Sequence, residues 1–262
     1  MSMQRDGNKC LHTVGESDII QQETAVASKA LKRGRLWGKT GKILKGAVDM
    51  CGRYYIAQED NDEEIARIIA ELNKDTPQAA EIHLGEIFPS QVAPVIVNTP
   101  SGWAVKPMKW GFPRNGGGGL VINSRSEKAD VTPMFSKAVR ERRCLVPMSG
   151  FYEWRRTATG AKTKEKFAFT LAEKGPMFLA GVYGLFGGGY EAGGYDGFAI
   201  LTQAADEQML PFHHRMPVIL STRQARHGWL FAPPQVNYGD LRSLFRTPGL
   251  LVKEAGTNAA AL

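Results

Sequence analysis

The sequence predicts an α+β protein made of a single domain, in which helices flank a mostly antiparallel, barrel-like β core. Two observations lead to this prediction. Many short runs have strand-like composition and are joined by Gly-rich turns, and a few segments between them carry helix signals. The chain of 262 residues contains no internal repeat. About 210 residues follow position 49, which is enough for one domain with a substantial core.

The helix signals combine capping residues with apolar spacing. In Asp60–Leu72, a polar and acidic start is followed by isoleucine and leucine at i, i+3, i+4 and i+7, which predicts a helix of about four turns. A second helix is expected over Thr132–Arg142, capped at its start by a Thr-Pro pair. A third is expected over Ser221–Phe231, opened by a Ser-Thr pair.

The segments between these helices are rich in β-branched and aromatic residues, which is typical of strands. Together with the Gly-rich turns, they indicate a barrel-like sheet with helices on its flanks. The predicted strands are Val92–Val97, Trp103–Trp110, Leu120–Ser124, Cys144–Val146, Phe151–Arg155, Phe167–Leu171, Met177–Phe186, Phe198–Thr202 and Val218–Leu220.

The first 49 residues differ in character from the rest. They hold 9 of the 33 Lys and Arg residues but only 5 of the 26 Asp and Glu, and they lack the long apolar run of a signal peptide or membrane anchor. They are either a genuine basic arm or sequence translated from a start codon placed too early. We favour the second, because Lys45–Ala47 can be encoded by a purine-rich stretch where a bacterial ribosome-binding site would precede the codon of Met50. The domain is then expected over residues 50–253, with 254–262 as a disordered tail.

Charge and cysteine content narrow the function only slightly. Residues 50–262 carry a net charge of +3, so any path for nucleic acid must be a local groove lined by a few arginines. The cysteines, Cys10, Cys51 and Cys144, show neither metal-ligand spacing nor a disulfide framework. We therefore expect no metal or cofactor, no membrane partner, and a reducing, cytoplasmic location.

Cys51 stands in a segment, Met50–Arg53, that reads like the start of a protein. An amino-terminal cysteine carries an α-amine and a thiol with ordinary pKa values of about 8 and 8.5, so both are partly deprotonated near neutral pH. An aldehyde can form a Schiff base with the amine, after which the thiol closes a five-membered thiazolidine. The alternative is that Cys51 is a small buried hydrophobic residue at the start of a strand.

Four blocks in the chain resemble the SOS-response-associated peptidase (SRAP) family in their order and spacing. They are Met50–Arg53, Ile122–Arg125, Arg143–Trp154 and His213–Pro217, and the resemblance extends over residues 50 to about 253. It implies an enzyme that senses abasic sites in single-stranded DNA and crosslinks itself to them through its amino-terminal cysteine. It also implies autoproteolytic peptidase and lyase-type chemistry, an α/β fold around a barrel, no cofactor, and a monomer whose partner is single-stranded DNA.

Glu153 lies inside an aromatic-rich strand, between Tyr152 and Trp154. Burial there would raise its pKa, which suits a residue that transfers protons near neutral pH. Strand alternation could instead turn Glu153 outward. The resemblance implies that it is the catalytic glutamate, which protonates the sugar oxygen and assists loss of water at the Schiff base.

The resemblance assigns roles to further residues. His213, selected over its neighbour His214 by the family's His-x-Arg-Met-Pro pattern, would hold or protonate the sugar oxygen. Asn123 would orient the amine of Cys51. The implied DNA contacts are Arg53, Arg125 and Arg215 to phosphates, Thr202 near the site, and Pro89 and Trp110 against bases.

The chain departs from the common family pattern in two places. Glu86-Ile87-Phe88-Pro89 stands where many members have Asn-Val-Ala-Pro, and the loop after Trp110-Gly111 is short and lacks tryptophan. These changes affect how DNA is gripped rather than the chemistry. Two other functions remain open: a general cysteine peptidase using Cys51, His213 and Asn123, and a non-catalytic single-stranded DNA-binding module.

Overall fold

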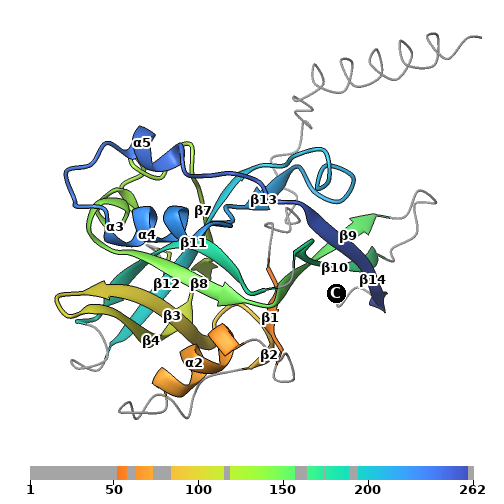
Figure 1. Cartoon of the computed structure of the whole chain (residues 1–262), viewed down its shortest axis with the longest axis horizontal. Coiled ribbons are helices and arrows are strands. Elements are labelled where there is room, and N and C mark those ends of the chain that lie inside the picture. The colour runs from red at the N-terminus through yellow and green to blue at the C-terminus, as the bar shows by residue number, and fades with distance from the viewer. Residues whose placement is uncertain are drawn as a thin grey trace, which may run out of the picture. The chain divides into compact units, whose positions relative to one another are not determined.

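The structure is a computed structural model that describes residues 52–57, 63–72, 84–114, 119–156, 164–173, 175–188 and 194–258 (Figure 1). The predictions made for Cys51 and for residues 1–49 lie outside these described residues. The fold class is confirmed: one α+β domain is built around antiparallel sheets with helices on their outside.

The larger sheet closes into a five-stranded barrel. Its strands pair in the order β11-β8-β3-β4-β12, and β12 pairs back to β11. All pairings in this circuit are antiparallel except the parallel contact between β4 and β12. The barrel strands are β3 (Val92–Thr99), β4 (Gly102–Trp110), β8 (Arg143–Met148), β11 (Met177–Phe186) and β12 (Tyr195–Ala204).

Two short strands extend β12 beyond the barrel and carry candidate site residues. Strand β7 (Asn123–Arg125) runs parallel to β12, and β13 (Arg215–Pro217) runs antiparallel to it on the opposite edge. A separate two-stranded ribbon is formed by β5 (Phe112–Pro113) and β6 (Leu120–Val121).

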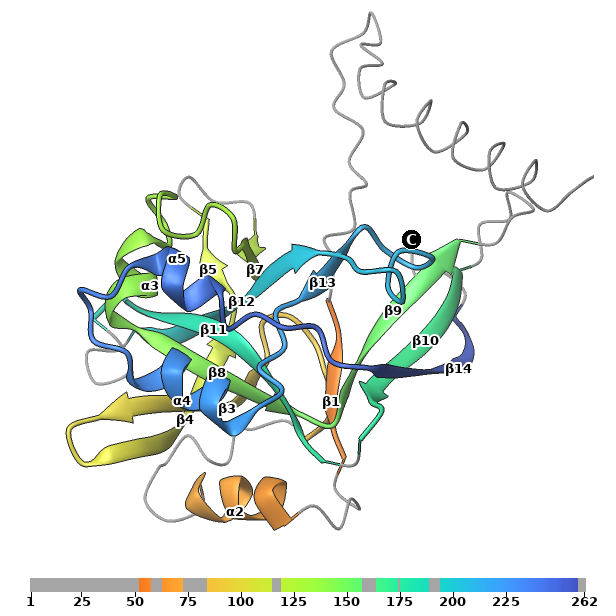
Figure 2. The same ribbon diagram turned by 45° about the horizontal axis from the view of Figure 1, so that its top comes forward.

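A second, antiparallel sheet stands beside the barrel with strand order β14-β10-β9-β1-β2. Figure 2 shows β1 between the barrel and the strands β9, β10 and β14. The chain passes from the barrel into this sheet at Ser149, because β8 ends just before this residue and β9 begins just after it. The strands are β1 (Tyr54–Ile56), β2 (Gly85–Ile87), β9 (Gly150–Arg156), β10 (Lys164–Leu171) and β14 (Leu250–Asn258).

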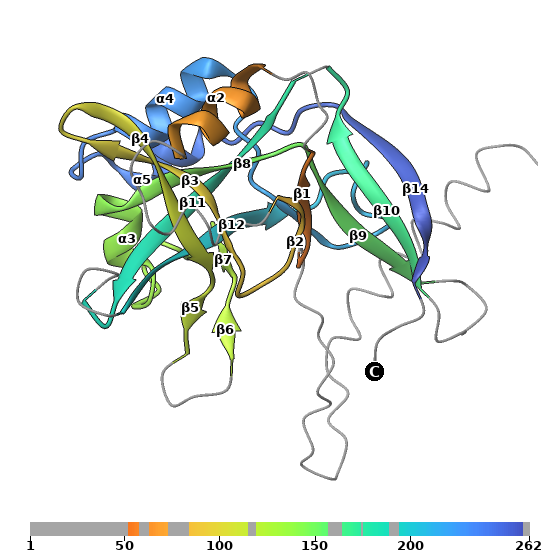
Figure 3. The ribbon, with the colours of Figure 1, turned by 90° about the horizontal axis from the view of Figure 1, so that it is seen from below.

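The helices cover the outside of the barrel. Helix α2 (Glu63–Leu72) buries Ile65 and Ile68 and contacts β3 and β4. Helix α4 (Arg223–Phe231) contacts β3, β8 and β11, and Figure 3 shows it beside α2. The shorter helices are α3 (Ser136–Glu141) and α5 (Tyr238–Arg242). No helix in the described ranges is long and apolar enough to cross a membrane.

Most predicted elements are confirmed, including α2 and α4. The hydroxyl of Thr222 caps α4 by accepting a hydrogen bond from the Ala225 amide at 3.0 Å, as its sequence signal indicated. The second helix begins later than predicted, because Thr132 belongs to a preceding turn. Its carbonyl accepts from the amides of Phe135 and Ser136, and its hydroxyl donates to the Lys128 carbonyl.

Two further predictions are corrected. Val218–Leu220 is buried but not a strand: it makes one isolated bridge, between Ile219 and Leu179, and the neighbouring strand is β13. The expected disordered tail at 254–262 is also wrong over its first part, because β14 continues to Asn258. The strand begins with the apolar run Leu250–Val252, and backbone pairing with β10 continues it through the polar residues that follow.

Candidate functional site

Glu153 lies on the buried face of the second sheet. Its exposed fraction is 5%, it shares this face of β9 with Phe151, and its direct partner on β10 is Phe167. The alternative of an outward-facing Glu153 is therefore wrong, since alternation places Tyr152 and Trp154 on the other face. A carboxylate buried among aromatic rings lowers the stability of the fold unless it is hydrogen-bonded or paired. Its presence here therefore suits a residue with a role in the site.

The chain enters β1 alongside Glu153. Tyr54 pairs with Phe151, and the Tyr152 amide donates to the Arg53 carbonyl at 2.9 Å, which continues the same antiparallel register. Extended by one residue, this register would bring Gly52 opposite Glu153. Cys51, which lies outside the described residues, is the next residue along the chain.

Packing of Phe212, the residue before His213, places this segment against the second sheet. The ring of Phe212 packs at 4.8 Å from Phe167 and 5.0 Å from Phe169, measured between centroids. Because Phe167 is the cross-strand partner of Glu153, the segment that holds His213 lies next to the catalytic candidate. The neighbouring His214 is exposed.

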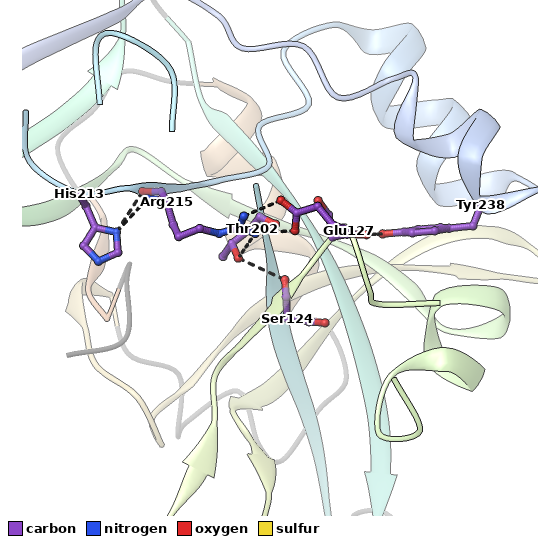
Figure 4. Close-up of polar contacts among 7 residues, drawn as sticks. Ser124, Glu127, Thr202, His213, Arg215 and Tyr238 are labelled. Carbon is purple, nitrogen blue, oxygen red and sulfur yellow. Dashed lines mark hydrogen bonds and ion pairs between the residues drawn. The ribbon is translucent and has the colours of Figure 1, made fainter. Parts of the chain in front are cut away.

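The orientation of the His213 ring is set by its own segment. Its Nδ1 accepts a hydrogen bond from the Arg215 amide at 3.1 Å (Figure 4). The same nitrogen lies 3.3 Å from the Arg215 carbonyl, so it accepts from the amide in one tautomer and donates to the carbonyl in the other. In both cases the backbone of Arg215 engages Nδ1 and orients the ring.

The side chain of Arg215 is already engaged by protein oxygens. Its guanidinium donates to both carboxylate oxygens of Glu127, at 2.5 and 2.8 Å, and to the carbonyl of Thr202 at 2.7 Å. Figure 4 shows these groups meeting at the end of β12, with His213 on the far side of Arg215. Arg215 holds the pKa of Glu127 below its ordinary value, chiefly through the hydrogen bonds and with a further charge contribution.

Thr202 supports this ion pair from β12. Its side chain is buried, and its hydroxyl accepts from Arg215 at 3.3 Å and lies 3.4 Å from the Ser124 carbonyl. In the parallel register of β7 and β12, Thr202 stands beside Arg125, and Ile200 beside Asn123. Asn123 and Arg125 share one face of β7, since Ser124 between them is buried.

The structure thus brings Asn123, Arg125, Thr202 and Arg215 together on β7, β12 and β13. Glu127 is a candidate site residue that sequence reasoning missed. It follows Arg125 by two positions, but its partner Arg215 is 88 residues away in sequence. No local pattern in the sequence therefore predicts the ion pair.

Arg53 and Pro89 lie at the edge of the second sheet. The guanidinium of Arg53 donates to Glu86 at 3.1 Å and packs over the rings of Phe88, at 4.2 Å, and Trp154, at 5.1 Å. Pro89 is half-buried in the turn between β2 and β3, where the next residue, Ser90, has a φ of 75°. Proline followed by a residue with positive φ is typical of a type II turn.

Trp110 does not contact solvent. Its exposed fraction is 0%, its ring packs edge-on to Tyr54 at 5.1 Å, and its indole nitrogen donates to the Ile122 carbonyl at 3.1 Å. A ring without exposed surface cannot stack on a base, so the expected contact between Trp110 and DNA is corrected. Trp110 instead joins the barrel to the second sheet.

Cys144 is a structural thiol. It is fully buried in the barrel, and burial raises its pKa well above the ordinary value, which suppresses the reactive thiolate at neutral pH. Among the described residues, no three His, Cys, Asp or Glu side chains gather to hold a metal ion.

The fold is a barrel joined to a second sheet. Glu153 is buried near the start of β1, and the segment that carries His213 packs nearby. These features define a protein with a candidate active site at its amino-terminal strand. The chain belongs to the SOS response associated peptidase (SRAP) family, whose model matches residues 50–250.

Named relatives and solved structures agree with this membership. The chain is 30% identical to the abasic site processing protein YoqW of Bacillus subtilis over 188 residues, which are 69% of this chain and 80% of that protein. It is 30% identical to the abasic site processing protein YedK of Escherichia coli over 185 residues, 69% of this chain and 79% of that protein. A crystal structure of a protein from Bordetella bronchiseptica shares the fold with a TM-score of 0.60 at 21% identity, covering 78% of this chain and 99% of the other.

Proposed function

We propose that this protein processes abasic sites in single-stranded DNA by forming a covalent thiazolidine with Cys51, once Cys51 has become the amino-terminal residue. The observation that carries the proposal is the buried Glu153 on β9, the strand that pairs with β1, because β1 begins three residues after Cys51. The names of the relatives YoqW and YedK support abasic sites as the substrate.

The reaction joins an aldehyde and an aminothiol. The α-amine of Cys51 attacks the aldehyde carbon of the ring-opened sugar, and loss of one water gives an imine. The thiol then adds to the same carbon, so that one C–N and one C–S bond form while the aldehyde oxygen leaves as water. Glu153 transfers the protons that ring opening and water loss require, a contribution typically worth about 10²–10⁴-fold in rate.

His213 and Asn123 complete the proposed site. His213 would hold or protonate the sugar oxygen through Nε2, because its Nδ1 is engaged by the backbone of Arg215. Asn123, on the strand beside β12, would orient the amine of Cys51 without adding charge. Single-stranded DNA is the expected form, since a paired strand would obstruct approach of the opened sugar to the residue that precedes β1.

The DNA backbone would be bound by arginines at the ends of β7 and β13. Arg125 is exposed and suited to a phosphate. Most N–H donors of Arg215 are already bound to Glu127 and Thr202, so few remain for a phosphate. Its main role would be to position β13 and His213. Arg53 is shared between Glu86 and two aromatic rings, which favours a contact to a base over a contact to phosphate.

The reaction requires removal of Met50, which exposes the α-amine of Cys51. Either the thiol attacks the preceding carbonyl with help from Glu153 and Asn123, as the family name suggests, or a methionine aminopeptidase removes Met50. The first route is hydrolysis of one peptide bond, with water supplying the atoms that end on the two products. Active-site variants that retain Met50 when made without an aminopeptidase would identify the autoproteolytic route.

One contact argues against a general cysteine peptidase. In a peptidase triad, Nδ1 of the histidine donates to the residue that orients it. Here Nδ1 of His213 lies 3.1 Å from the amide and 3.3 Å from the carbonyl of Arg215, so its partner is the backbone of its own segment. Asn123 is therefore not required to hold this ring, and turnover of peptides in trans is not expected.

The test is a denaturing gel. Protein beginning at Cys51 is incubated with a single-stranded oligonucleotide carrying one abasic site, or carrying the tetrahydrofuran analogue that has no aldehyde. We expect a shifted band that survives heating with the abasic oligonucleotide alone, and an unchanged band pattern in the Cys144→Ala control. Salt-sensitive binding to both oligonucleotides without a covalent product would identify a DNA-binding module, and cleavage of added peptides a peptidase.

A further inference from the structure

A cation–aromatic cluster occupies the face of the second sheet opposite Glu153. On β9 the side chains alternate, and Tyr152 and Trp154 point to this face while Phe151 and Glu153 point to the other. The cluster lies at the end of β1 where the chain arrives from Cys51. Its members are Arg53, Glu86, Phe88, Tyr152, Trp154 and Lys166.

Glu86 and Lys166 form the fixed part of this cluster. The Nζ of Lys166 donates to both carboxylate oxygens of Glu86, at 2.9 and 3.0 Å, and lies 3.7 Å from the centre of the Tyr152 ring. Lys166 is 8% exposed. A buried ammonium requires a charged partner, so Glu86 cannot readily leave Lys166 to bind another group.

Arg53 is held by the same carboxylate. Its Nη1 donates to Glu86 at 3.1 Å, and its guanidinium faces the rings of Phe88 and Trp154, at 4.2 and 5.1 Å from their centres. Two cations therefore share one carboxylate, which leaves the cluster with a single positive charge. The guanidinium lies against two aromatic rings rather than extending freely into solvent.

Phe88 is the open side of the cluster. It is 38% exposed, and among the large hydrophobic residues of the described chain only one other aromatic ring, that of Trp103 on β4, is comparably exposed. An exposed ring beside an arginine is the arrangement on which unpaired bases stack.

Covalent geometry places Arg53 close to the reactive residue Cys51, at a distance that the next nucleotide of a bound strand can span. Two peptide units separate Cys51 from Arg53, so their Cα atoms lie no more than about 7 Å apart. A base attached to the sugar next to the lesion would therefore meet Arg53 and Phe88 while the lesion itself meets Cys51.

We infer that Phe88, Arg53 and Trp154 form a stacking site for the nucleobase adjacent to the abasic site, and that Glu86 and Lys166 hold Arg53 in the stacking orientation. The inference rests on the proposed function, because it assumes that the lesion is bound at Cys51. A purine offers a larger stacking surface than a pyrimidine, so the site favours a purine neighbour.

The test measures binding without chemistry. Fluorescence anisotropy is recorded with single-stranded oligonucleotides that carry the unreactive tetrahydrofuran analogue, flanked on either side by adenine, by thymine or by a second tetrahydrofuran. We expect the adenine neighbour to bind most tightly on one side of the lesion. Phe88→Ala should remove this preference and weaken binding of the adenine oligonucleotide on the order of tenfold.

Two further variants make the result specific. Phe88→Trp should restore the preference, and Trp103→Ala, which removes the exposed ring on β4, should leave it unchanged. A Phe88→Ala protein that keeps the wild-type ranking overturns the stacking site. Because the analogue cannot crosslink, a wild type that shows the ranking but forms no covalent product keeps the stacking site and overturns the proposed chemistry.

Discussion

The carboxylate of Glu127 and the guanidinium of Arg215 form a two-point ion pair, with N–O distances of 2.5 and 2.8 Å, across 88 residues of sequence. The pair joins the turn after β7 to β13. The backbone amide of Arg215 in turn holds Nδ1 of His213 at 3.1 Å. One surface carboxylate thereby helps to fix the orientation of a proposed catalytic histidine.

We expect Glu127→Gln to loosen β13 and with it His213. Crosslinking to abasic single-stranded DNA should slow several-fold, while the free energy of unfolding should fall by about 0.5–1 kcal/mol, because the Glu127 side chain is 36% exposed and screened by water. A time course and a denaturant titration measure the two effects. The matched control is Glu207→Gln, an exposed glutamate on the loop before His213; equal behaviour of the two variants would remove the positioning role of Glu127.

The same pair predicts how stability depends on pH. Arg215 lowers the pKa of Glu127 in the folded state, so the unfolded chain binds this proton more readily than the folded chain does. The stabilisation is therefore complete above the ordinary carboxyl pKa of about 4.3 and is lost as the pH falls through the lower folded value. Unfolding midpoints of wild type and Glu127→Gln should differ at pH 7 and converge as the pH falls below the ordinary carboxyl pKa. A difference that stays constant with pH would contradict the coupling.

Glu153→Gln keeps the shape of the side chain but cannot exchange a proton. We expect crosslinking to slow by about 10²–10⁴-fold, and reversal of an existing crosslink to slow as well, because both directions use the same proton transfers. Glu173→Gln, an exposed substitution after β10, is the control for the loss of one charge. If Glu153→Gln matched wild type in both directions, Glu153 would be structural.

Glu86→Gln tests the internal support of the cation–aromatic cluster. The buried ammonium of Lys166 would lose its charged partner, so the free energy of unfolding should fall by about 1–3 kcal/mol. The double variant Glu86→Gln with Lys166→Met should recover most of this loss, since no unpaired buried charge remains. Thermal or denaturant unfolding is measured for wild type, Glu86→Gln, Lys166→Met and the double variant. Additive losses in the double variant would show that the two residues do not depend on each other.

Local patterns in the sequence were sufficient for elements that bury an apolar stripe. The spacing of Ile65 and Ile68 predicted α2, and the Ser-Thr pair before Arg223 predicted the start of α4. Glu153 was identified as a candidate because a carboxylate among aromatic residues is unusual. These signals are local, and the physical causes, burial of one helix face and capping of a first turn, are local as well.

Contacts between distant strands could not be read in this way. Glu127 meets Arg215 only because β7 and β13 both attach to β12. Trp110 is buried because the second sheet covers it with Tyr54, and the capture of Arg53 by Glu86 depends on the pairing of β1 with β2. The second half of β14 is polar, and its pairing with β10 extends through that part of the strand. Each of these depends on tertiary pairing, which propensity and spacing do not encode.

The intact mass of the protein after reaction with a single-stranded abasic oligonucleotide tests the central claim most directly. Three proteins are compared: one beginning at Cys51, one beginning at Cys51→Ala, and the full chain of 262 residues. The first should gain the mass of the oligonucleotide less one water, in a product that survives heating and whose proteolytic fragments place the modification on Cys51. The second should give at most an imine that borohydride traps, and the third should stay unmodified unless it is cleaved between Met50 and Cys51. A heat-stable adduct on uncleaved full-length protein would contradict the account, because the nitrogen of Cys51 is then a peptide amide and cannot form the imine.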